Sequence, residues 1–116
     1  MKYLLLINND PATLAALSEQ EQQELMSEVE SLMAEISASG ELLGGQALAD
    51  ASQTKTVRVR GGSVTATDGP FAEAKECLAG TLMVECETVE RAVEIASRWP
   101  DAKFGAMEVR PIIDTF

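Results

Sequence analysis

Residues 19–39 read EQEQQELMSEVESLMAEISAS, the longest regular pattern in this chain of 116 residues. Apolar side chains recur along it at intervals of one, three, three, one and three, the spacing of one face of an α-helix. Ser18 followed by Glu21 predicts a capping box at the start, and Gly40 predicts a left-handed stop at the end. We expect this helix to pack on a sheet. Its apolar stripe consists of Leu25, Met26, Val29, Leu32, Met33 and Ile36.

Strand patterns lie on both sides of this helix. Residues 2–8 form a nearly unbroken apolar run, which is typical of a central strand buried on both faces. Residues 41–48 form a second strand candidate, in which Gly44 and Gly45 predict a bulge or a close backbone approach. The first half of the chain therefore predicts strand, helix, strand.

The second half of the chain repeats this order. Residues 78–87 are predicted as a strand, and Thr88 then caps a helix that Trp99 and Pro100 close. A last strand is expected over residues 104–112, with a proline near its end that is typical of a sheet edge.

A β-hairpin is predicted between the two halves. Two alternating runs, residues 56–60 and 63–67, flank the dipeptide Gly61-Gly62, which suits a two-residue turn. Such a turn fixes which residues face each other across the hairpin. The expected pairs are Val59 with Val64 and Val57 with Ala66 on one face, and Arg58 with Thr65 and Arg60 with Ser63 on the other.

This element order predicts an α+β fold over a single domain, residues 1–116. It matches a ferredoxin-like split βαβ plan with an inserted hairpin and an antiparallel sheet that carries both helices on one face. The other face of the sheet then lacks cover within the chain. We therefore expect a homodimer.

Composition limits the classes of function. The 19 acidic and 9 basic residues give a net charge of −10, which disfavours direct binding to nucleic acid or anionic membranes. The chain has no histidine, which excludes a histidine-based triad or zinc site, and Cys77 and Cys86 are expected to be buried thiols. The apolar run at residues 1–10 is too short for a signal segment or membrane span, so a cytoplasmic protein is expected.

The turn that follows the hairpin is the candidate site. Asp68 is a candidate proton acceptor, and nearby arginines would bind an anionic group of a small polar ligand. Alternatively, Asp68 caps its own turn and pairs with an arginine, while Phe71 anchors the loop. No metal or cofactor is expected, because the acidic clusters lack a cation-binding pattern. The candidate ligand-binding residues are Arg58, Arg60, Asp68, Gly69, Pro70, Phe71, Lys75 and Arg110.

The stretch Asp68-Gly69-Pro70-Phe71-Ala72-Glu73-Ala74-Lys75-Glu76 resembles the YCII-related family, in the branch named for its Asp-Gly-Pro-Phe motif. The resemblance extends to residues 1–7, 42–45 and 105–112, and so covers nearly the whole chain. It implies a dimeric α/β barrel built from ferredoxin-like subunits.

The activity of a related branch does not carry over to this sequence. That branch, which includes a dehydrochlorinase for chlorinated hydroquinones, resembles this chain but uses a histidine with an aspartate before a loop proline. Here no histidine exists, and Trp99 precedes Pro100 while Asp101 follows it. The present branch is often found beside alternative sigma factors, which implies a regulatory or accessory setting. Three hypotheses stay open: a dimer that binds a small ligand, a cofactor-independent lyase or isomerase that uses Asp68, and a protein-interaction module for a sigma factor.

Overall fold

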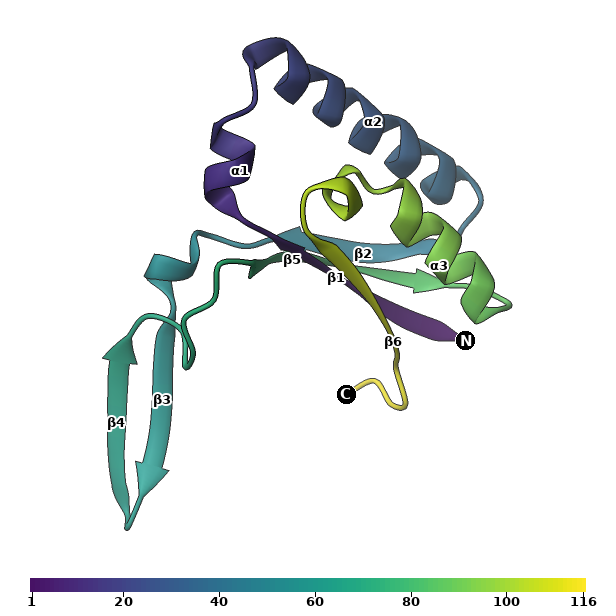
Figure 1. Cartoon of the computed structure of the whole chain (residues 1–116). Coiled ribbons are helices and arrows are strands. Elements are labelled where there is room, and N and C mark those ends of the chain that lie inside the picture. The colour runs from purple at the N-terminus through teal and green to yellow at the C-terminus, as the bar shows by residue number, and fades with distance from the viewer.

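Strand β1 lies inside a four-stranded antiparallel sheet with the order β2-β5-β1-β6 (Figure 1). The structure is a computed structural model that describes all 116 residues. The order is that of a ferredoxin-like split βαβ arrangement, so the predicted α+β fold is confirmed. The strands of this sheet are β1 (Lys2–Asn9), β2 (Leu42–Ala47), β5 (Cys77–Glu85) and β6 (Ala106–Pro111).

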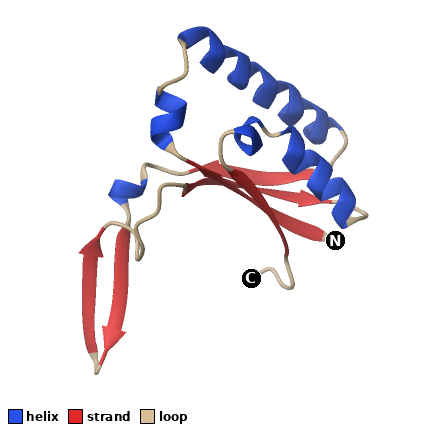
Figure 2. Cartoon of the chain, in the orientation of Figure 1, coloured by secondary structure: helices blue, strands red, loops and turns tan.

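Helices α2 (Glu19–Ala38) and α3 (Val89–Arg98) cover one face of the sheet (Figure 2). The predicted capping box is present, since Ser18 Oγ accepts from the Glu21 amide and a Glu21 carboxylate oxygen accepts from the Ser18 amide, both at 3.1 Å. A short helix α1 (Pro11–Ala15) precedes α2 and was not predicted. Five residues are too few for a periodic apolar stripe.

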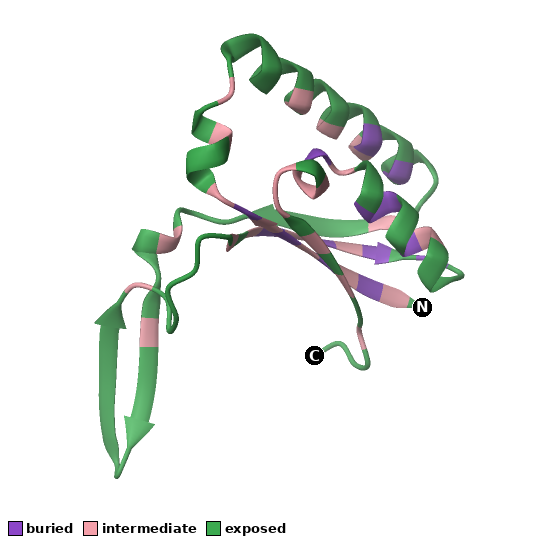
Figure 3. Cartoon of the chain, in the orientation of Figure 1, coloured by how far each residue is buried: buried purple, intermediate pink, exposed green.

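The core lies between the helices and the sheet (Figure 3). Leu32 and Ile36 of the predicted stripe are buried, whereas Met26 is 60% exposed. The stripe therefore packs on the sheet over the C-terminal half of α2. The buried cluster consists of Tyr3, Leu5, Leu32, Ile36, Leu82, Val84, Cys86, Ala92, Ile95 and Ala96.

Strand β1 is buried on one face only. Its residues alternate between buried and half-buried, with Leu5 and Ile7 on the helix side and Leu4 and Leu6 on the other. The prediction of burial on both faces is wrong for the single chain, because no helix or strand of the same chain covers the second face (Figure 1). We call this uncovered side of the four-stranded sheet the open face.

Strands β3 (Lys55–Arg60) and β4 (Ser63–Asp68) form a separate two-stranded sheet. All four predicted residue pairs are present. Gly61 and Gly62 have φ angles of 55° and 80°, as a tight turn between these strands requires. The hairpin projects from one end of the main sheet, on the side opposite the helices (Figure 1).

Smaller predictions had mixed outcomes. The β2–β5 register shifts between Leu42 and Gly44, which confirms a bulge there, and β6 is an edge strand as expected.

Both cysteines are free, and Cys86 is buried, but Cys77 is only half-buried because it lies where β5 leaves the covered part of the sheet. One 3₁₀ turn, η1 (Ala51–Gln53), lies in the segment between β2 and β3. None of the helices has the length and apolar character that crossing a membrane requires.

Candidate functional site

The predicted Asp68 turn is held by two hydrogen bonds to residues at the start of β3. The Gly69 amide donates to the Thr54 carbonyl at 2.7 Å, and Thr56 Oγ1 donates to the Gly69 carbonyl at 2.7 Å. The Asp68 carboxylate forms an ion pair with Lys55 on the facing strand, and both side chains are exposed. Asp68 therefore pairs with a lysine instead of an arginine, and its carboxylate does not cap its own turn.

A pocket of about 570 Å³ lies at the base of the hairpin. Two connecting segments line it, residues 48–54 and 70–78, and they include Pro70 and Phe71 of the predicted site. Neither Asp68 nor any arginine or lysine lines this pocket. Phe71 is 80% exposed, so its ring does not anchor the loop within the single chain.

The predicted cationic residues do not come together at one site. Arg58 and Arg60 lie along the hairpin, on the face opposite its valines. Lys75 lines a shallow pocket together with Pro70, so these two predicted residues do lie near each other. Arg110 is on β6, across from Leu4, on the open face of the main sheet. Of the predicted residues, the structure thus brings Pro70 and Lys75 to one pocket, whereas Asp68 pairs with Lys55 and the three arginines lie elsewhere.

A second cavity, of about 410 Å³, lies between α2 and the main sheet. Its walls are largely apolar and include Ile7, Val29 and Met33. Two of its polar residues form a pair, in which Asn9 Nδ2 donates to Asp101 Oδ2 at 2.7 Å. Asn9 is buried at the end of β1, and Asp101 lies in the 3₁₀ turn η2 (Pro100–Lys103) after α3. We call this space the helix–sheet cavity.

The chain positions this pair through a close backbone approach. A Cβ atom on Gly105 would lie 2.1 Å from the Asn8 carbonyl oxygen and 2.9 Å from Asn9 Cα, so only glycine fits there. The Asp101 carbonyl accepts from the amides of Phe104 and Gly105, and these bonds close the end of η2. Asp101 Oδ1 forms no hydrogen bond within the chain, and this oxygen is free to accept one from a bound molecule.

Sequence reasoning missed this pair, although one signal was present. Asn9 continues the two-residue period of Tyr3, Leu5 and Ile7, the buried residues of β1. A polar side chain in phase with a buried face needs a buried hydrogen-bond partner. The identity of that partner, Asp101, is set only by the fold, because 92 positions separate the two residues.

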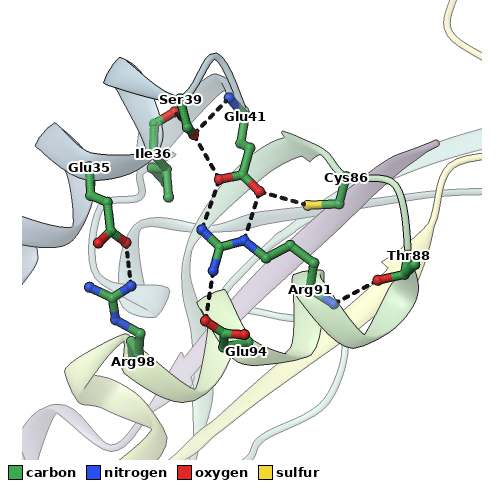
Figure 4. A network of polar contacts seen from close by, with 9 residues as sticks. All are labelled: Glu35, Ile36, Ser39, Glu41, Cys86, Thr88, Arg91, Glu94 and Arg98. Carbon is green, nitrogen blue, oxygen red and sulfur yellow. Dashed lines mark hydrogen bonds and ion pairs between the residues drawn. The ribbon is translucent and has the colours of Figure 1, made fainter.

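A polar network lies at the opposite end of the helical layer (Figure 4). The Arg91 guanidinium donates to both Glu41 carboxylate oxygens, at 2.8 and 2.9 Å, and to Glu94 at 2.7 Å. Ser39 Oγ also donates to Glu41, at 2.7 Å. Hydrogen bonds from Arg91 and Ser39 lower the pKa of Glu41 from 4.5 to about 2, and the same carboxylate raises the pKa of Arg91. Burial and then the charge of Glu41 raise the pKa of the Cys86 thiol.

This network is structural in character. Its bidentate ion pair joins the segment between α2 and β2 to α3, and the side chains of both partners are half-buried. A second ion pair, between Arg98 and Glu35, connects α3 directly to α2. A Cys86 thiol that is stabilised in its protonated form is a poor nucleophile, so the cluster does not resemble a catalytic site.

Comparisons with known proteins place the chain in a family. The family model for the YCII-related domain matches residues 1–115. An uncharacterized protein of Rhizobium meliloti (strain 1021), R00369, is 30% identical over 114 residues, which cover 97% of this chain and 92% of that protein. The chain therefore belongs to the YCII-related family, as the resemblance of the sequence implied. Its assignment to the Asp-Gly-Pro-Phe branch stays a prediction.

Proposed function

We propose that this protein binds a small molecule in the helix–sheet cavity. The observation that carries the proposal is the Asn9–Asp101 pair, a buried amide and a half-buried carboxylate that line an otherwise largely apolar cavity. Small-molecule sites commonly combine apolar walls with a few fixed polar groups. Here Asn9 holds one carboxylate oxygen of Asp101, and the other is left to receive a donor from the ligand.

The charge of the lining indicates the class of ligand. Asp101 is the only ionisable residue among those that line the cavity, and no arginine or lysine is present to bind an anion. A carboxylate accepts hydrogen bonds and attracts positive charge. The expected ligand is a molecule with an apolar body and a hydroxyl, amide or amine donor, and not the anionic group for which the predicted arginines were suited.

A thermal-shift screen with two matched variants tests this proposal. A ligand that binds only the folded state must raise the melting temperature. We expect compounds from a library of small alcohols, amides and amines to stabilise the wild type and Asp68→Asn, but to lose this effect in Asp101→Asn. If no compound stabilises the wild type at high concentration, the proposal is wrong. If Asp68→Asn alone loses the effect, the ligand binds at the Asp68 turn, as the sequence predicted.

We also propose that the chain is a homodimer whose two open faces meet. Leu4, Leu6 and Met83 lie next to one another in the strand register on this face and are only half-buried within one chain. Ile113 and Phe116, beyond β6, are fully exposed. Burial of such side chains against a second copy is worth about 25 cal/mol for each Å² of apolar surface.

Free thiols are typical of reducing compartments, which supports a cytoplasmic location.

The predicted association with a sigma factor stays a separate hypothesis. It rests on the resemblance alone, and the acidic surface of α2 is the segment to which it would apply. Co-purification of an untagged alternative sigma factor with the tagged protein tests it. Failure to co-purify at low ionic strength would contradict it, since contacts between charged surfaces are strongest there.

A further inference from the structure

We propose that residues 55–68, which we call the hairpin arm, pack against a second copy of this chain in the homodimer. This inference rests on the proposed dimer and adds a second contact to it. The arm projects on the side of the sheet that bears no helix, so that arm and open face border one common space (Figure 1). A second copy seated on the open face therefore lies beside the arm.

The face of the arm that carries its apolar residues has no partner within the chain. Val57, Val59 and Val64 lie on one face of the hairpin and are 63%, 56% and 70% exposed. A two-stranded hairpin is at best marginally stable alone and gains its stability by packing. An arm with three exposed valines on one face is thus expected to be covered in the functional assembly.

The extent of the chain's surface fits this assignment. The accessible surface is 7,795 Å², about 1,700 Å² more than the roughly 6,100 Å² expected for a compact protein of 12.4 kDa. The radius of gyration is 16.3 Å, against about 13 Å for a compact domain of this length. A standard interface buries only about 800 Å² on each partner, so the excess surface suffices for a stable dimer.

The distribution of charge favours a second copy as the partner. The arm holds Lys55, Arg58, Arg60 and a single acid, Asp68, and so has a net charge of +2. The remaining residues hold 6 basic and 18 acidic side chains, a net charge of −12. Two whole chains repel each other, but the arm of one is electrostatically complementary to the body of the other. The two arginines lie on the face of the arm opposite the valines, so their charge acts at longer range than the valine contact.

Sedimentation equilibrium with two variants of equal charge tests the arm. Val59→Asp places a carboxylate on the valine face, whereas Thr65→Asp places one on the opposite face of the same hairpin. We expect Val59→Asp to raise the dissociation constant of the dimer at least tenfold and Thr65→Asp to change it less than threefold. Both residues are exposed and distant from the core, so Trp99 fluorescence and melting should report an intact fold.

Trypsin provides a second readout for the wild type. Cleavage after Arg58 and Arg60 should be several-fold slower above the dissociation constant than below it, because the arm is covered only in the dimer. If the protein dimerises and Val59→Asp weakens the dimer no more than Thr65→Asp does, the valine face of the arm is not part of the interface, and only the proposed open-face dimer remains. If the wild type is a single chain at all concentrations, both the arm contact and the homodimer are wrong.

Discussion

Replacement of Glu41 by glutamine should make the stability of this protein less dependent on acid pH. Glu41 accepts two hydrogen bonds from Arg91 and one from Ser39, and these lower its pKa from 4.5 to about 2. A pKa shift of this size corresponds to about 3 kcal/mol of folding stability, at about 1.4 kcal/mol for each unit of pKa. The side chain keeps 18% exposure, and solvent screening reduces the expected contribution to about 2 kcal/mol.

The direction of the pH effect follows from the lowered pKa. The ionised carboxylate is favoured in the folded state, so its contribution is fully present above about pH 4.5. It declines as the pH falls toward 2, where the carboxylate of the folded protein takes up its proton. Glu41→Gln removes this titration. The difference in unfolding free energy between wild type and variant should therefore be about 2 kcal/mol at pH 7 and about half that at pH 3.

Urea unfolding followed by Trp99 fluorescence measures this difference. Trp99 is the single tryptophan of the chain and packs against the buried cluster, so its emission reports the core. Glu94→Gln is the matched control, since Glu94 contacts the same guanidinium from an exposed position and should cost less than about 1 kcal/mol. Comparison at one protein concentration keeps any dimerisation equal. An unchanged difference between pH 7 and pH 3 would refute the assigned role of the Glu41 carboxylate.

Three further predictions concern the fold and the dimer. Gly105→Ala should lower the unfolding free energy by about 2–4 kcal/mol in urea, because its Cβ would overlap the backbone of β1, and a loss below 1 kcal/mol would contradict that close approach. Ser18→Ala should cost about 1 kcal/mol in the same assay through loss of the cap of α2, and no loss would mean that the cap is dispensable. Leu6→Asp should convert the dimer to single chains in sedimentation equilibrium, with Gln23→Asp on exposed α2 as the unaffected control, and a persistent dimer would exclude the open face.

The elements that could be predicted from the sequence are those whose signals are local. The cap at Ser18 and the stop at Gly40 bound α2 to within a residue, and Gly61-Gly62 fixed every pair in the hairpin. The position of the hairpin relative to the sheet has no such local signal. Helix α1 could not be predicted, because its cue, Asp10 before a proline, is equally typical of the end of a strand.

The candidate site was harder to predict because it depends on distant residues. A cluster of arginines around Asp68 is plausible from their number and spacing, yet strand pairing directs Arg58 away along the hairpin and Arg110 to another strand. The Asn9–Asp101 pair forms only when β1 and the turn after α3 meet. The two-residue period of β1 marked Asn9 as inward-facing, but no local pattern marks Asp101 as its partner.

The location of a bound ligand tests the account most directly. In a ¹H–¹⁵N NMR titration with the most stabilising compound of the library, backbone amides of a 116-residue chain can be followed one by one. We expect the largest shifts at Asn9, Thr81 and Asp101, around the helix–sheet cavity. Chemical-shift changes centred on residues 68–75, with no change at those three amides, would contradict the proposed site and indicate that the ligand binds at the Asp68 turn.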